Sequence, residues 1–205
     1  MVVPLAGLSV VDAGDDATAL LGRMLSDLGA TVRLVGPKDP IGEALNDVDS
    51  YRGAFAVGKS TLERVELLRA CHDADVVLAG NLAKFPELGA ASDWPSRFPG
   101  TILVSITPFG TSGPMSHRAS SDLVNMAMSG YLNMTGPEGG PPLKPSAPLL
   151  SWRHACNHAL VGLLLAIRQR RLTGQATHVD VAARDTGLWM LTHTYQYWDM
   201  EQINL

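Results

Sequence analysis

LSVVDAGDDATALLGRMLSDLGATVRLV, at residues 8–35, is the stretch that decides the fold. Residues 8–11 form a short apolar run that ends in turn-forming residues, as a buried strand does. Over residues 17–28 apolar side chains recur at helical spacing, and Gly29 stands where a C-terminal cap is expected. A second apolar run follows at residues 32–35. Strand, helix and strand of these lengths predict a βαβ unit with parallel strands and a right-handed crossover.

The rest of the chain continues this alternation. Residues 60–63 (STLE) have the form of a capping box and predict a helix that runs to about residue 72. Apolar runs and helical periodicity predict further strands at 75–79, 101–106 and 177–181, and helices at 121–129, 151–171 and 184–198. The predicted fold class is α/β, with a Rossmann-like parallel sheet flanked by helices.

Composition and charge exclude several classes of protein. Of 205 residues, 46% are hydrophobic and 18% are charged, which is typical of a globular protein. A net charge of -4 gives no basic surface for a nucleic-acid partner. The longest apolar run, residues 159–167, is about half of the ~20 residues that span a bilayer, so no membrane partner is expected. Cys71 and Cys156 lack metal-ligand spacing and are typical of buried thiols in a cytoplasmic protein.

The turn after the first predicted strand does not suit a dinucleotide. Nicotinamide and flavin dinucleotide sites use G-x-G-x-x-G there, so that the backbone can approach the pyrophosphate. This chain has Asp15 and Asp16 instead, and their carboxylates repel phosphate. We expect the two acids to cap the following helix. The alternative, an acidic Mg²⁺ pocket, needs another Asp at the end of a middle strand, and residues 75–81 (DVVLAGN) offer none there.

Two further groups of residues are candidates for ligand binding. His154 and His158 are four residues apart on a predicted helix, a spacing that can bind metal. No Glu completes H-E-x-x-H and no third ligand is evident, so core or interface histidines are favoured and no metal is predicted. Lys38, Arg52 and Lys59 lie in or beside the loop after the second strand. They either pair with ligand phosphates or are solvated, and the residues alone leave both readings open.

A set of motifs in a fixed order covers nearly the whole chain. Its members are PLAGLSVVD at 4–12, LSDLGATV at 25–32, VSITPFG at 104–110, GP at 113–114, DLV at 122–124, TGP at 135–137 and RRLTGQATHVDV at 170–181. The set resembles the N-terminal half of the class III CoA-transferases. That family includes the formyl-CoA and carnitine CoA-transferases and the alpha-methylacyl-CoA racemases.

The resemblance implies a CoA-binding domain in a dimer whose chains interlock, or in an assembly of subunits. In such enzymes an aspartate attacks the acyl-CoA thioester, which gives a mixed anhydride and then an aspartyl-CoA thioester. Coenzyme A or an acyl-CoA is the expected ligand, with no covalently bound cofactor. Because ligands of open α/β sheets lie at the carboxyl ends of the strands, the expected CoA-binding residues are Lys38, Arg52, Lys59, Gly80, Asn81, Phe109 and Gly110.

The chain departs from the family at the nucleophile. Counting back from the Thr-Gly pair of the last motif places Trp152 where the family has its catalytic aspartate. The neighbouring Ser151 and Arg153 are not carboxylates either, so no catalytic residue is assigned. Racemase chemistry is not favoured, since Ser121 stands where the racemases have a histidine.

Three regions and two hypotheses follow. Residues 1–135 are expected to form the Rossmann-like CoA-binding domain, residues 136–150 a Gly/Pro-rich linker, and residues 151–205 a long helix, a strand and a C-terminal helix that complete the domain or dock a partner. The first hypothesis is a CoA-transferase subunit that draws its catalytic carboxylate from a partner, either a homologous subunit or a second copy. The alternative is a non-catalytic subunit that binds acyl-CoA or scaffolds an active one.

Overall fold

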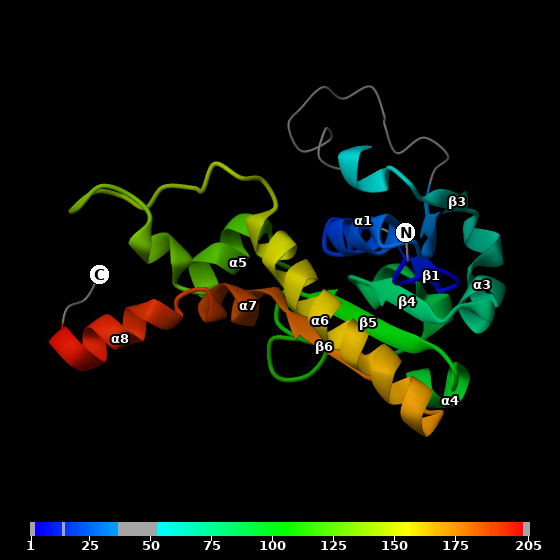
Figure 1. Cartoon of the computed structure of the whole chain (residues 1–205). Coiled ribbons are helices and arrows are strands. Elements are labelled where there is room, and N and C mark those ends of the chain that lie inside the picture. The colour runs from blue at the N-terminus through cyan, green and yellow to red at the C-terminus, as the bar shows by residue number, and fades with distance from the viewer. Residues whose placement is uncertain (1–2, 14, 37–52, 203–205) are drawn as a thin grey trace.

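A six-stranded parallel sheet forms the centre of the molecule (Figure 1). The computed structural model describes residues 3–13, 15–36 and 53–202. The strands lie in the order β3-β2-β1-β4-β5-β6, and each pairs in parallel with its neighbours. Their bounds are β1 Ser9–Asp12, β2 Thr31–Val35, β3 Ser60–Leu62, β4 Val76–Ala79, β5 Ile102–Thr107 and β6 His178–Ala182. The predicted α/β class and parallel sheet are confirmed.

Helices cover both faces of the sheet, as a parallel sheet requires. The helices with described bounds are α1 Ala19–Asp27, α3 Leu67–Asp73, α4 Trp94–Arg97, α5 Asp122–Met128, α6 Leu150–Thr173, α7 Ala183–Trp189 and α8 Thr192–Glu201. Short 3-10 turns lie at η1 Arg64–Glu66, η2 Leu82–Lys84, η3 Pro86–Leu88, η4 Ala91–Asp93 and η5 Tyr131–Met134. Among the described residues, no helix is both long and apolar enough to cross a membrane.

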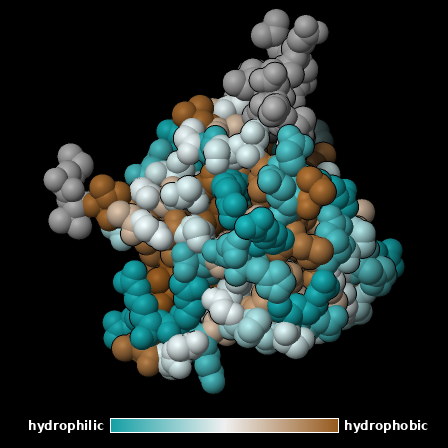
Figure 2. All heavy atoms as spheres, turned by 90° about the vertical axis from the view of Figure 1, so that its right-hand side faces the viewer, coloured by the Kyte–Doolittle hydropathy of each residue, from teal (hydrophilic) through white to brown (hydrophobic). Residues whose placement is uncertain are grey.

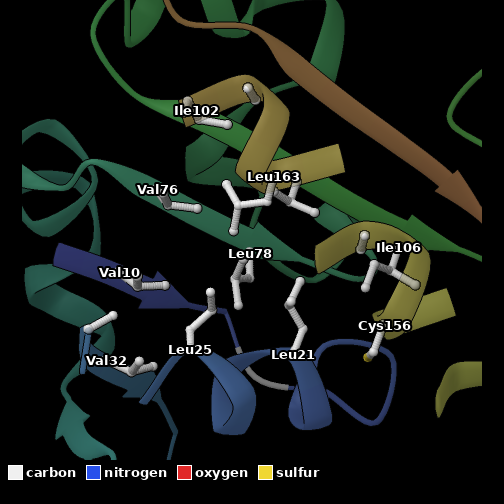
Figure 3. Packing of buried hydrophobic residues seen from close by; sticks show 14 of the residues in the cluster. Val10, Leu21, Leu25, Val32, Val76, Leu78, Ile102, Ile106, Cys156 and Leu163 are labelled. Carbon is white, nitrogen blue, oxygen red and sulfur yellow. The ribbon is translucent and has the colours of Figure 1, made fainter. Parts of the chain in front are cut away.

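Alternation along the strands divides the buried residues into two cores. Val10 faces α1 and α6, whereas its neighbour Val11 faces α3 and α4, because successive strand side chains point to opposite faces. Figure 3 shows the first core, in which Leu21 and Leu25 of α1 and Leu163 of α6 point toward the strands. All of β4 is buried, which places this strand in the middle of both cores.

Two predicted elements were wrong. Residues 60–62 form β3 and not the start of a helix, because they pair with β2 and bury Leu62 against the second core. Glu63 has an extended backbone, and α3 begins only after the 3-10 turn η1. The single helix predicted over residues 184–198 is two helices, α7 and α8, separated at Met190 and Leu191. Local capping preference at residues 60–63 was outweighed by strand pairing with a distant segment.

A buried ion pair ties the approach to β3 to the end of β1. The Lys59 ammonium donates to Asp12 Oδ2 at 2.8 Å and to the Ala19 carbonyl at 3.0 Å, and Thr18 Oγ1 donates to Asp12 Oδ1 at 2.7 Å. The exposed fractions of the Lys59 and Asp12 side chains are 1% and 0%. A Cβ on Gly22 of α1 would lie 2.6 Å from Lys59 Nζ, so the pair requires glycine there. Both charges are therefore held under α1, away from water.

We expect Lys59→Ala to lower the free energy of unfolding by about 3–5 kcal/mol, because it leaves the Asp12 carboxylate buried without its cation. Urea denaturation followed by circular dichroism measures the loss. Lys144→Ala, which removes the same charge from an exposed position, is the matched control, with an expected change within about 0.5 kcal/mol. Equal effects of the two variants would contradict a stabilising role for the pair.

Candidate functional site

The carboxyl edge of the sheet between β1 and β4 is the topological switch point of the fold. The chain passes from β1 outward to β2 and β3, then returns to continue at β4 on the other side of β1. In open α/β sheets, ligands bind at the carboxyl ends of strands at such a point. The turns that meet there carry Asp15, after β1, and Gly80 and Asn81, after β4. The structure therefore brings two of the predicted CoA-binding residues together with an acid.

Asp15 bridges the two turns. Its Oδ1 accepts a hydrogen bond from the Ala17 N–H at 3.0 Å, and its Oδ2 accepts one from the Asn81 N–H at 3.3 Å. The Lys84 ammonium lies 3.5 Å from Oδ2. Burial raises the pKa of Asp15, an effect that Lys84 and the two N–H groups oppose. The N-cap residue of α1 is Thr18 and not Asp15. Of the predicted capping by Asp15, the structure shows one hydrogen bond, from the Ala17 N–H in the turn before the helix.

The contact with Asp15 constrains both Gly80 and Asn81. A Cβ at Gly80 would collide with the Asp15 carboxylate, so the strand end and the acid pack directly against each other. The Asn81 side chain accepts a hydrogen bond from the Ala83 N–H at 2.9 Å and begins the 3-10 turn η2. Lys84 ends that turn with a side chain that is 58% exposed. Lys84 is a cation at this edge that sequence reasoning missed, because nothing in the pattern links it to Asp15.

Of the three cations predicted to bind phosphate, the structure describes only Lys59. Lys38 and Arg52 lie outside the described residues. Lys59 is buried in its pair with Asp12, and this placement argues against the phosphate contact considered for it. The physical reason is that two of the three ammonium donors of Lys59 already bond to a buried carboxylate and a helix carbonyl, and its side chain is shielded from solvent.

Phe109 and Gly110 border a pocket of about 420 Å³ at the carboxyl ends of β5 and β6. Gly110 has a φ of 89°, and its N–H donates to Thr107 Oγ1 at 2.9 Å, which closes the turn after β5. Asp180 accepts from the N–H and Oγ1 of Thr111 at 2.9 and 2.6 Å and so anchors this loop to β6. Arg184 lies over the Phe109 ring, 5.9 Å from its centroid, and its guanidinium pairs at 2.7 Å with Asp185, which also lines the pocket.

The first turn of α6 carries Trp152. Its indole is half-buried and packs against the core formed with α1. The Ser151 N–H and Oγ both donate to Asp122 Oδ1, at 2.8 and 2.7 Å, and Asn125 Nδ2 donates to Ser151 Oγ at 3.2 Å. Leu149, the N-cap of α6, has a φ of 56°, a conformation that is strained for a branched side chain. Asp122 of α5 thus supplies the cap that Leu149 cannot, a role that sequence reasoning missed.

The histidines do not extend the site. His158 Nδ1 lies 3.0 Å from the His154 carbonyl oxygen, and burial together with His158 and Arg153 lowers the pKa of His154. His178 Nε2 lies 2.9 Å from the Oγ of Ser105, which is fully buried, and burial lowers the pKa of His178. Within the described ranges, no three metal-ligating side chains gather in a group.

The chain matches the model of CoA-transferase family III over residues 5–204. It is 39% identical over 202 residues to the succinyl-CoA:glutarate CoA-transferase of Mus musculus, covering 86% of this chain and 44% of that protein. It is 27% identical over 214 residues to the succinyl-CoA:(R)-benzylsuccinate CoA-transferase subunit BbsE of Thauera aromatica, covering 94% and 52%. The chain thus spans about half the length of these relatives.

A solved structure shares the fold. The CAIB/BAIF family protein from Brucella suis superimposes with a TM-score of 0.84 at 24% sequence identity. The match covers 98% of this chain and 59% of that one. At this identity the likeness shows the arrangement of strands and helices.

We expect Asp122→Ala to lower the free energy of unfolding by about 1–2 kcal/mol, because the Ser151 N–H in the first turn of α6 then loses its acceptor. Hydrogen exchange of the Ser151 amide should also become faster. Asp122→Asn keeps an acceptor oxygen and should cost less. Asp93→Ala, an acid removed from an exposed turn, is the control. Unchanged exchange at Ser151 in Asp122→Ala would rule out the capping role.

Proposed function

The chain belongs to CoA-transferase family III, and we propose that it is the acyl-CoA-binding part of an enzyme that transfers CoA between carboxylic acids. The observation that carries this proposal is the family match over residues 5–204. Relatives are named as CoA-transferases that use succinyl-CoA with glutarate or with (R)-benzylsuccinate. The proposed donor for this chain is therefore a CoA thioester of a small carboxylic acid.

We propose that CoA lies along the carboxyl edge of the sheet. Gly80 and Asn81 at the end of β4, and Phe109 and Gly110 beside the 420 Å³ pocket, are the proposed lining. With Lys59 buried, the phosphate contacts are proposed for Lys38 and Arg52. No cofactor is proposed beyond the CoA thioester itself.

The family chemistry needs a carboxylate that this part of the chain lacks at its expected position. The carboxylate oxygen attacks the thioester carbonyl and expels the CoA thiolate, which leaves a mixed anhydride. The thiolate then attacks the enzyme carbonyl, releases the acyl group as a carboxylate and leaves an enzyme–CoA thioester. The indole of Trp152 cannot form an anhydride, and Asp122 is already bonded twice to Ser151. We propose that a partner chain supplies the nucleophile.

The surface around α6 and α8 supports assembly with a partner. Val161, Leu165 and Leu172 of α6 are 60%, 63% and 74% exposed, and Trp189 at the end of α7 is 65% exposed. Figure 1 shows α8 extending away from the sheet, and none of its residues is buried. Figure 2 shows a different side, around α3 and β3, where apolar patches lie among hydrophilic residues. The apolar α6–α8 side is of the kind enriched at protein interfaces.

A second function is favoured by Trp152 itself. The half-buried indole of Trp152 packs against the first core and so stabilises the fold. A non-catalytic subunit needs the fold but not the nucleophile, and a tryptophan at this position meets that need. In this second candidate the chain binds acyl-CoA, or scaffolds an active subunit, without reacting.

The purified chain is expected to bind CoA without forming a covalent adduct. Titration calorimetry with CoA, an acyl-CoA, NAD and FAD should give heat for the two CoA species only. Incubation with acyl-CoA, trapping with hydroxylamine or borohydride, and mass spectrometry should find no modified Asp or Glu. Binding of NAD or FAD with no response to CoA would contradict the proposed ligand. A trapped adduct would contradict the need for a partner carboxylate.

We expect the chain to associate at micromolar concentration, so light scattering should give a mass above the 21.8 kDa of one chain. Trp189→Glu should weaken association at least about tenfold, since it places a charge in the apolar surface. Val65→Glu is the matched control, because Val65 is 91% exposed on the η1 turn. A monomer that is unaffected by either variant would contradict the proposed interface.

A further inference from the structure

The turn between β1 and α1 is the place in this sheet where phosphate is expected. With strand order 3-2-1-4-5-6, pyrophosphate lies at the first strand-to-helix turn and receives hydrogen bonds from backbone N–H groups. This sheet has that order, and Asp15 in that turn extends to the turn after β4. The chain therefore places its own carboxylate where such a sheet receives a ligand anion.

The contacts of Asp15 are those that a bound oxyanion makes. The Ala17 N–H comes from the turn before α1, the Asn81 N–H from the turn after β4, and the Lys84 ammonium from the end of η2. These donors belong to two separate segments of the chain and converge on one carboxylate. Without the Asp15 side chain, two N–H groups and one cation would face the same space.

Asp15 also fills that space. Its carboxylate packs directly on Gly80, where even a Cβ would collide with it, and its side chain is only 18% exposed. A phosphate is larger than a carboxylate and so has no room beside it. An ionised Asp15 would also repel the phosphate charge.

The position is not favourable for a charged acid. Burial raises the pKa of Asp15, and nearby Asp12 acts in the same direction, against Lys84 and the two N–H groups. A raised pKa means that the ionised form is less stable in the folded chain than in the unfolded chain, so the fold is relatively less stable above that pKa. An acid kept at such a position on a ligand-binding edge is typical of a functional residue.

We propose that Asp15 is a specificity-determining residue that excludes phosphate and pyrophosphate from the switch point between β1 and β4. The groups of a ligand that reach this point are then uncharged or cationic, and the phosphates of a bound nucleotide lie elsewhere along the edge. The inference goes beyond the proposed CoA-transferase function and does not depend on it.

Titration calorimetry with inorganic pyrophosphate and with ADP, at fixed pH and ionic strength, tests the proposal. The proteins compared are the unmodified chain, Asp15→Ala, Asp15→Ala combined with Lys84→Ala, and Asp93→Ala as a control for loss of one acid. Asp15→Ala should bind pyrophosphate at least about tenfold more tightly than the unmodified chain, the gain of about one charge-assisted hydrogen bond. The double variant and Asp93→Ala should bind as the unmodified chain does.

Two results would overturn the proposal. One is equal affinity of Asp15→Ala and the unmodified chain for pyrophosphate. The other is a gain that persists in the double variant, which would locate the anion away from Lys84. If circular dichroism shows that Asp15→Ala does not fold, Asp15→Ser replaces it, because serine also removes the charge and most of the volume of the carboxylate, and a gain of at least about threefold is expected. Binding of CoA by the unmodified chain is measured in a separate titration. Failure of the proposed function, which is no CoA binding, is therefore distinguishable from failure of the Asp15 proposal, which is an unchanged affinity for pyrophosphate.

Discussion

A parallel sheet has to be covered on both faces, and the arrangement of this molecule follows from that constraint. The strand β4 is buried along its whole length, so α1 and α6 must lie on one face and α3 and α4 on the other. The long helix α6 has to cross several strands, and each of its ends is fixed by hydrogen bonds. Arg170 near its C-terminus donates to the carbonyls of Asp75 and Gly100, and Ser151 at its N-terminus donates to Asp122. The position of Trp152 is thereby determined by packing across the sheet.

The helix that covers this face of the sheet also separates a buried ion pair from charged groups that a ligand can reach. Lys59 is held with Asp12 beneath α1, where the pair links the segment before β3 to the centre of the sheet. Asp15 lies three residues beyond Asp12 but at the open edge, beside Lys84. Two acids that are three residues apart thus have different roles, because Asp12 at the end of β1 points under the helix and Asp15 crosses to the turn after β4.

Most of the sheet could be predicted from the sequence, since β1, β2, β4 and β5 carry apolar runs of strand length, and apolar residues alternate with polar ones in β6. The strand β3 could not, because Ser60 and Thr61 are polar and exposed, and only pairing with β2 makes the segment a strand. The candidate site was predicted in part. Gly80 and Asn81 followed from the rule that ligands bind at carboxyl strand ends, whereas the burial of Lys59 depends on an acid 47 residues earlier. Contacts between such distant residues leave no local pattern in a single sequence.

Gly22 links residues that are far apart in the chain. Any side chain at that position would enter the space held by the Asp12 carboxylate and the Lys59 ammonium. Positions 12, 22 and 59 are therefore expected to covary among homologues: an aspartate and a lysine require glycine, and a homologue with small apolar residues at positions 12 and 59 is free to carry alanine at 22. Because Gly22 has no Cβ, replacement at any one of these three positions should be accompanied in evolution by replacement at the others.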